Sequence, residues 1–340
     1  MIRFAKNLKP EFVPDETVKR IRKALDTPYK YGAVVKTDGF LCDSPSVFCL
    51  KGKWYMMYLK INKDCHADGY ETHIAESDDL LNWRDVCPVL TRQSGESWDA
   101  KQIAGYLGLA DIDLGKNREP AKINGNYVVT YLGGNADGYE PVPLYAGLAR
   151  TPDLLKKDLY IRNDKPLFTP FDTDARESEK LAIYRSFLFY DEKQVLGYPY
   201  VLIYNAKDKA RKERILLAVS NDGISFERYG EDAVIDLSEV FDGIKISADA
   251  QIIKIGDVYT AIFFALDESQ KAYSTFACSY DLIHWSYNKE APLIESSEDF
   301  DNLYAHKSFI VERDGVIYNY YCAVNTAGER FIALATSRKV

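Results

Sequence analysis

The stretches HIAESDDLLNW (residues 73–83) and TFACSYDLIHW (residues 275–285) each contain an apolar strand, a serine and a closing tryptophan. Three further segments repeat the apolar strand that ends in Ser or Thr: GLARTPDLL (147–155), LLAVSNDGISF (216–226) and IALATS (332–337). A motif that recurs along most of a sequence indicates a repeat architecture. The motif therefore divides this chain into five repeats.

An aromatic strand precedes each copy of the motif. The five strands are WYMMYL (54–59), YVVTYL (127–132), YVLIYN (200–205), YTAIFFA (259–265) and YNYYCA (318–323). Short turns with Gly, Asn or Asp introduce most of them, which is typical of tight hairpins. Each repeat then has an inner strand, an aromatic strand, the motif strand and an outer strand. This pattern predicts an all-β fold, a five-bladed β-propeller.

The N-terminal part of the sequence is expected to close the ring and to carry one helix. The last repeat has no outer strand of its own, and YGAVVK (31–36) is the natural strand to complete it. Residues 14–26 predict a short helix, with Pro14 in its first turn and an apolar face. We therefore expect an N-terminal extension over residues 1–30 and a propeller over residues 31–340. The helix is expected to pack on the rim or to form a homodimer contact.

Composition and charge argue against several classes of protein. The net charge of −8 leaves no basic stripe for a nucleic acid. No apolar stretch is long enough for a membrane span, and the opening MIRFAKNLKPEF lacks the apolar core of a signal peptide. The six cysteines form no CxxC pair, so we expect buried thiols and a cytoplasmic location. A removed leader would instead indicate a periplasmic or secreted protein.

Ionisable residues stand at the start of each expected inner strand. The segments are LCDSPSVF with Asp43, NREPAKI with Arg118 and Glu119, AIYRSFLFY with Arg185, ISADAQIIKI with Asp249, and YAHKSFIV with His306 and Lys307. Inner strands of a propeller line the central axis, so these side chains are expected to converge there. Gathering them costs desolvation free energy unless they pair or perform chemistry.

Mixed charges at one site can hold a carboxylic acid and a carboxylate side by side, which glycoside hydrolysis requires. We therefore predict Asp43, Glu119, Asp249 and His306 as catalytic, and Arg118, Arg185 and Lys307 as substrate-binding. The structural alternatives are a turn cap for Asp43, an ion pair with Arg185 for Asp249, a core position for His306 and an orienting contact to Arg118 for Glu119.

Two further residues suit a sugar subsite, because an aromatic face and an amide fit a sugar ring. They are Trp98 and Gln102, which stand before the expected inner strand of the second repeat; ordinary loop packing is the alternative for Trp98. No cofactor is expected to be required. Asp249 and His306 could bind a divalent cation near the axis, but no ligand spacing demands one.

The sequence resembles the five-bladed glycoside hydrolases of families 43, 32, 62, 117 and 130. The resemblance rests on the S-x-D-L-x-x-W elements Ser77–Trp83 and Ser279–Trp285, on the D-x-P of Asp43–Pro45 and on the aromatic strands, and it covers about residues 41–337. Similarity to family 43 implies that Asp43 is the general base of an inverting mechanism. Similarity to family 117 implies a set of Asp43, Glu119, Asp249 and His306, with the histidine as proton donor.

The expected function is that of an inverting, exo-acting glycoside hydrolase on a plant or algal oligosaccharide or polysaccharide. Two alternatives remain open. Family 130 includes phosphorolytic members, so a glycoside phosphorylase could use Arg118, Arg185 and Lys307 to hold phosphate. A non-catalytic, carbohydrate-binding propeller is the second alternative.

Overall fold

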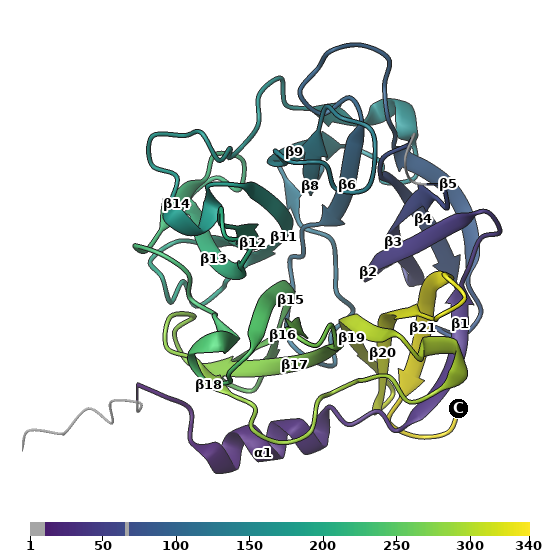
Figure 1. Ribbon diagram of the computed structural model, residues 1–340, viewed down its shortest axis with the longest axis vertical. Helices are drawn as coiled ribbons and strands as arrows, with labels where there is room; N and C mark the ends of the chain where they lie inside the picture. The colour runs from purple at the N-terminus through teal and green to yellow at the C-terminus, as the bar shows by residue number, and fades with distance from the viewer. Residues whose placement is uncertain (1–10, 65–67) are drawn as a thin grey trace, which may run out of the picture.

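The computed structural model describes residues 11–64 and 68–340. Antiparallel strands form groups around a common centre, and one α-helix lies outside them (Figure 1). The predicted mostly-β fold is thus confirmed. Residues 1–10, which hold most of the opening segment and the start of the N-terminal extension, and Cys65 lie outside the described residues. No helix in the described residues is long and apolar enough to cross a membrane.

Two groups of strands are separate sheets. The first contains β2 (Phe40–Leu50), β3 (Lys53–Asn62), β4 (Glu71–Ser77) and β5 (Arg84–Leu90). The second contains β6 (Gln102–Leu107), β7 (Lys122–Ile123), β8 (Asn126–Gly134), β9 (Tyr145–Thr151) and β10 (Ile161–Arg162). The aromatic strands predicted at 54–59 and 127–132 lie within β3 and β8.

The remaining strands form one hydrogen-bonded sheet, which short parallel contacts between β13 and β15 and between β17 and β19 divide into groups. Its strands are β11 (Ala182–Tyr190), β12 (Tyr200–Lys207), β13 (Glu213–Ser220), β14 (Glu227–Tyr229), β15 (Ile244–Ile255), β16 (Val258–Asp267), β17 (Ala272–Ser279), β18 (Ser286–Tyr287), β19 (Tyr304–Arg313), β20 (Val316–Val324), β21 (Arg330–Thr336) and β1 (Tyr29–Val35). Short 3-10 turns lie at Lys157–Leu159, Glu177–Glu179, Leu237–Glu239 and Asp299–Asp301.

Strand β1 lies beside the last strand of the sequence. It pairs with β21 in antiparallel register, with Ala33 opposite Ala333, and it contains the segment 31–36 apart from Lys36. Figure 1 places β1 and the C-terminus side by side. The group β19, β20 and β21 therefore receives its outer strand from the N-terminal part of the sequence.

The repeated serine ends the third strand of a group by capping a tight turn. The hydroxyl of Ser77 accepts a hydrogen bond from the amide of Leu80 at 2.9 Å, and Ser279 holds Leu282 in the same way at 2.8 Å. Both leucines have a left-handed backbone, with φ of 68° and 67°, and both are fully buried. A short polar residue that bonds the backbone locally is favoured at such turns. The motif is therefore structural.

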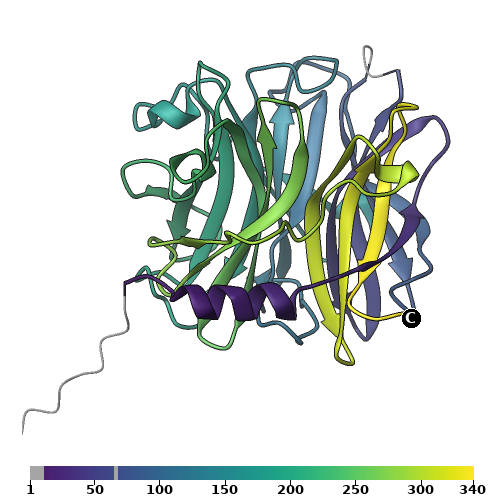
Figure 2. The ribbon, with the colours of Figure 1, turned by 60° about the horizontal axis from the view of Figure 1, so that its bottom comes forward.

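Helix α1 (Asp15–Ala24) packs on the outside of the strand groups (Figure 2). Its buried residues Val18 and Ile21, together with Leu25, join a cluster with Ile262 and Phe276 of β16 and β17. Acidic residues occupy its first turn and basic residues its last turn, which favours the helix dipole. The predicted helix and its rim packing are confirmed, whereas the homodimer contact stays a prediction.

Four inner strands carry a β-bulge at the same point. The pairing is interrupted between Asp43 and Ser46 in β2, Ile183 and Ser186 in β11, Ala248 and Gln251 in β15, and His306 and Phe309 in β19. Ser44, Asp249 and Lys307 have positive φ values within these bulges. A bulge bends its strand and redirects a side chain, and bulges are common beside active sites. In contrast, β6 pairs with β8 without interruption.

Candidate active site

A cavity of about 300 Å³ opens where the bulged inner strands begin. Lys307 and Asp249, from the bulges of β19 and β15, line it together with His306. Its other charged residues come from the second and third strands of the groups and from one loop: Glu140, Lys207, Glu213 and Arg330. We call this cavity the axial pocket. The structure thus brings Asp249, His306 and Lys307 together, as predicted.

Asp43 lies beneath the axial pocket as the partner of two cations. Its Oδ2 atom accepts hydrogen bonds from Lys307 at 3.1 Å and from Arg330 at 2.9 Å, and its side chain is 1% exposed. Burial alone would raise the pKa of Asp43, but the charges of Lys307 and Arg330 outweigh it and hold the pKa well below its usual range. Such a carboxylate is a weak base. Asp43 is thus the buried partner of two cations and does not line the pocket itself, and the general-base role expected from the sequence stays a prediction.

Asp249 shares one of these cations. Its Oδ2 atom lies 3.5 Å from Nζ of Lys307, and its backbone amide donates to the side-chain oxygen of Asn205 at 3.2 Å. The ion pair with Arg185 that the sequence left open is not among the ion pairs of the described residues. Lys307 therefore links Asp249, in the cavity lining, to the buried Asp43.

His306 reaches the axial pocket as a neutral imidazole. Burial, followed by the charge of Lys307, lowers the pKa of His306 to about 3. Its Nδ1 atom lies 3.2 Å from the carbonyl oxygen of Cys322, which fixes the proton on Nδ1. A histidine proton donor needs a raised pKa, so the predicted donor role of His306 is not supported. The ring instead packs edge-on against Phe264 at 5.1 Å.

Glu213, at the start of β13, is a buried carboxyl group of the axial pocket with a raised pKa. Its side chain is 6% exposed, accepts a hydrogen bond from the side-chain amide of Asn205 and lies 3.2 Å from Nζ of Lys207. Burial raises the pKa of Glu213 to about 7; Lys207 lowers it, whereas the charges of Asp249 and Glu140 raise it further. At neutral pH a large part of this group therefore holds its proton.

Glu140 faces the same cavity from the loop between β8 and β9. Its Oε1 atom accepts a hydrogen bond from the hydroxyl of Tyr70 at 3.1 Å, and its φ of 50° places the residue in the left-handed region. The neighbouring Tyr139 accepts a hydrogen bond from Arg330 at 2.7 Å. Non-glycine residues in such a conformation cost free energy and cluster at functional sites. This loop therefore forms a fixed part of the pocket wall.

Gln102 supports this loop from below and does not face the pocket. The residue is fully buried, and its side-chain nitrogen donates to the carbonyl oxygens of Ala136 at 2.8 Å and Gly138 at 2.9 Å. Its side-chain oxygen accepts from the amide of Tyr70 at 3.1 Å. Both ends of the side-chain amide are thus engaged within the protein, so the predicted sugar contact of Gln102 is wrong.

Arg118 and Glu119 lie at the opposite end of the inner strands. The carbonyl of the preceding Asn117 accepts from the amide of Cys49, six positions after Asp43 in the same strand. A strand rises by roughly 3.3 Å per residue, which separates this segment from Asp43 by about 20 Å. Glu119 is exposed there. The structure therefore contradicts the expected place of both residues in the pocket, because the inner strand of the second group is β6 and not 117–123.

Arg185 and Trp98 lie outside the axial pocket. Arg185 is 2% exposed, stacks on Tyr106 at 4.9 Å and donates to the carbonyl of Pro45 at 3.4 Å, so it is buried among the inner strands and does not line the pocket. Trp98 lines a second cavity. Neither residue touches the space that holds Glu140 and Glu213. The proposed contact of Arg185 with substrate is therefore not supported by its position.

The cation expected near Asp249 and His306 stays a prediction, whereas the expected thiols can be compared with the structure. Residues 11–64 and 68–340 contain no group of three or more His, Cys, Asp or Glu side chains that could hold a metal ion. The five described cysteines are free, and four of them are buried, in agreement with the predicted thiols.

The sequence interpretation missed Lys207, Glu213 and Arg330. The sequence did contain a signal for these residues. In an antiparallel meander, the junction of the second and third strands lies at the same end of the blade as the start of the inner strand. Lys207 ends β12 and Glu213 begins β13, directly opposite each other, and Arg330 begins β21. Polar residues just before the repeated motif strand could therefore have been assigned to the site.

The axial pocket thus combines carboxyl groups and cations at one end of strand groups that are arranged around a common centre. No protein-family model matches this sequence, and no curated protein matches it. Among solved structures, one described as "Glycoside hydrolase" shares 40% identity over 96% of both proteins, with a TM-score of 0.90. Another, described as a complex of BT0996 with RGII, shares 39% identity over 96% of both proteins, with a TM-score of 0.89.

This protein belongs to the glycoside hydrolases. A family 117 glycoside hydrolase from the marine bacterium Zobellia galactanivorans has the same fold at 13% identity, covering 92% of this sequence and 90% of its own, with a TM-score of 0.62. The resemblance seen in the repeated motifs and aromatic strands is thus confirmed.

Proposed function

We propose that this protein hydrolyses a terminal glycosidic bond in the axial pocket of a closed five-bladed propeller, with Glu213 as the proton donor. The observation that carries the proposal is the buried Glu213, whose pKa is raised to about 7 beside two further carboxyl groups. A glycosidic leaving oxygen needs a proton from an acid that is still protonated near neutral pH. Glu213 meets this requirement.

Glu140 supplies the second carboxylate of the proposed mechanism. It lies on a different strand group from Glu213, and one of its oxygens is held by Tyr70. Both glutamates line the axial pocket of about 300 Å³, and the proposed water molecule would lie in this space between the acid and the base. We propose that Glu140 activates this water and that the reaction inverts the anomeric configuration. Asp43 and Lys307 then hold the pocket floor, and Asp249 helps to keep the proton on Glu213.

The size of the axial pocket supports an exo mode of action. Its volume of about 300 Å³ is at the lower end of the range for ligand pockets. Such a space suits one terminal sugar better than the middle of a polysaccharide. The hydrogen bond between Arg330 and Tyr139 spans one side of the opening. We propose a plant or algal oligosaccharide as substrate, with RGII oligosaccharides as the first candidates because a relative with 39% identity is described as a complex with RGII.

The charges in the pocket favour hydrolysis over phosphorolysis. Of the three cations expected to hold phosphate, Arg118 is at the other end of the strands, and Arg185 is buried and does not line the pocket. Lys307 is already paired with Asp43 and Asp249. The open cavity, with Glu213 and Glu140 on its wall, likewise supports an enzyme over a non-catalytic binding propeller.

One screen tests the proposed function. The protein is incubated with a panel of plant and algal oligosaccharides that includes RGII fragments, with and without phosphate, and the products are followed by NMR. We expect release of one terminal sugar, with inverted configuration and a rate that does not depend on phosphate. A sugar phosphate as the product would assign the protein to the phosphorylases, and retained configuration would make Glu140 a nucleophile.

A further inference from the structure

A second cavity, of about 450 Å³, lies next to the loop that carries Glu140. Trp98, Tyr145 and Phe171 supply its aromatic lining, and Asn135 and Thr169 contribute polar groups. The rings of Trp98 and Tyr145 are 6.0 Å apart and inclined by 74°, and those of Tyr145 and Phe171 are 6.4 Å apart. We call this cavity the aromatic groove. Aromatic faces with few polar groups are typical of sites that bind the apolar faces of sugar rings.

Trp98 is held in a fixed position by the strands beneath it. Its ring stacks on Tyr131 at 5.6 Å, with an angle of 14° between the planes. A Cβ atom at Gly133 would lie 2.4 Å from the Trp98 ring, and one at Gly147 would lie 2.7 Å from it. These two glycines therefore form the slot that admits the indole. The indole N–H makes no hydrogen bond within residues 11–64 and 68–340, and Trp98 is partly exposed in the groove.

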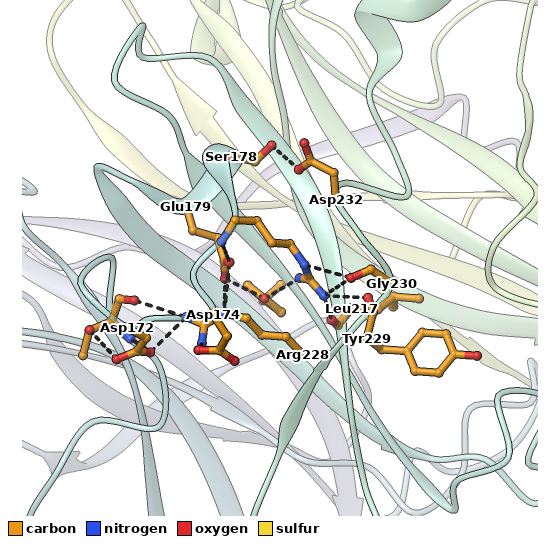
Figure 3. A network of polar contacts seen from close by, with 12 residues as sticks. Asp172, Asp174, Ser178, Glu179, Leu217, Arg228, Tyr229, Gly230 and Asp232 are labelled. Atoms are coloured by element: carbon orange, nitrogen blue, oxygen red, sulfur yellow. Dashed lines mark hydrogen bonds and ion pairs between the residues drawn. The ribbon is translucent and has the colours of Figure 1, made fainter.

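Phe171, on the other side of the groove, is 73% exposed on a turn that is firmly anchored. Figure 3 shows the network that holds this turn. Arg228 donates to the carbonyl of Thr169 at 3.1 Å and to Asp172 at 3.0 Å, and the Thr169 hydroxyl donates to Asp172 at 2.7 Å. Arg228 also forms a buried ion pair with Glu179 at 3.0 Å. The network keeps a large apolar ring in solvent, which has no benefit for folding.

The axial pocket and the aromatic groove share one wall, the loop of residues 135–143. Asn135, Val142 and Pro143 line the groove, whereas Tyr139 and Glu140 line the axial pocket. A sugar polymer that leaves the axial pocket over this loop would therefore meet the aromatic rings next.

We propose that the aromatic groove is a second sugar-binding site, which stacks a distal ring of the same oligosaccharide whose terminal sugar occupies the axial pocket. The proposal rests on the proposed function for the identity of the ligand. The groove would bind a neutral sugar ring between Trp98 and Phe171, with a hydrogen bond to the indole N–H. The enzyme would then distinguish long or branched oligosaccharides from short ones by affinity.

Calorimetry tests the proposal with an RGII oligosaccharide and its terminal disaccharide as probes. The proteins are Glu213→Gln, in which cleavage of the oligosaccharide is expected to be strongly slowed, and the double variant with Phe171→Ala in addition. We expect Phe171→Ala to raise the Kd for the RGII oligosaccharide by about fivefold or more and to leave the Kd for the disaccharide unchanged. Phe241→Ala removes an exposed phenylalanine outside the groove and should change neither value.

Two results would overturn the proposal: an unchanged Kd for the RGII oligosaccharide in the Phe171→Ala variant, or no binding of this oligosaccharide at all. An equal loss of affinity for both probes would also contradict it, since the disaccharide does not reach the groove. Failure of the proposed function gives a different result, because the wild-type protein would then bind the RGII oligosaccharide through Phe171 without releasing a sugar. Trp98→Ala, checked for folding by circular dichroism, repeats the test from the other side of the groove.

Discussion

Replacement of Glu213 by Gln removes the one proton that the proposed reaction requires. In the wild-type protein the pKa of about 7 means that, two pH units above this value, about 1% of the molecules hold the proton. We therefore expect kcat/KM of the wild type to fall by roughly tenfold per pH unit on the alkaline side. In Glu213→Gln this fall of kcat/KM at alkaline pH should disappear. The activity of the variant on natural oligosaccharides should be lower than that of the wild type by about 10²–10⁴-fold.

The assay compares two leaving groups across the pH range. A nitrophenyl glycoside needs little protonation of its leaving oxygen, so Glu213→Gln should retain much more activity on it than on an oligosaccharide. Glu231→Gln changes an exposed glutamate on the same strand group and serves as the matched control, with activity unchanged. Equal losses on both substrates, or a fall of kcat/KM at alkaline pH that persists in Glu213→Gln, would refute the assignment of Glu213 as the acid.

Further predictions concern stability. Asp43→Asn leaves Lys307 and Arg330 without their buried partner, so urea unfolding should show a loss of about 3 kcal/mol, whereas the exposed Asp164→Asn should change little. Because the pKa of Asp43 is lowered on folding, its stabilising contribution should be present above its unfolded pKa and be lost as the pH falls. Gly147→Ala places a Cβ 2.3 Å from the Tyr131 ring and should cost about 1–3 kcal/mol in the same experiment. Leu25→Ala, at the buried end of α1, should cost about 2–5 kcal/mol, and a loss below about 1 kcal/mol would show that the helix is not part of the folded core.

The repeats made much of the fold predictable. The Ser or Thr of the motif caps a turn. The aromatic strand before it packs between neighbouring strand groups. These requirements recur in each group, so they are visible in the sequence. The helix was predictable for a similar reason, since its charged ends and apolar face are local properties.

The second repeat was assigned incorrectly from the sequence. Residues 117–123 have an apolar run after two charged residues, which is the pattern of an inner strand. In the structure β6 takes that place earlier in the sequence, and the 117–123 segment runs along the far end. The exposed Glu119 and the buried Arg118 could not be told apart from pocket residues without knowing which strand pairs with β8.

The roles of the pocket residues depend on contacts between groups that are distant in sequence. Asp43 and His306 were predicted at the right end of the fold, but their pKa values follow from Lys307 and Arg330 and from complete burial. Glu213 is the first residue of a strand, and nothing in the local sequence marks it as special. Its pKa is raised only by burial and by the nearby carboxylates in the folded protein. Such effects require the assembled structure.

The most direct test of Glu213 as the proton donor is a crystal structure of Glu213→Gln soaked with an oligosaccharide that the wild-type protein cleaves. We predict a terminal sugar in the axial pocket, with the oxygen of the scissile bond within hydrogen-bonding distance of the side chain at position 213. A sugar bound elsewhere, or a scissile oxygen directed away from position 213 and toward Asp43 or His306, would contradict this assignment.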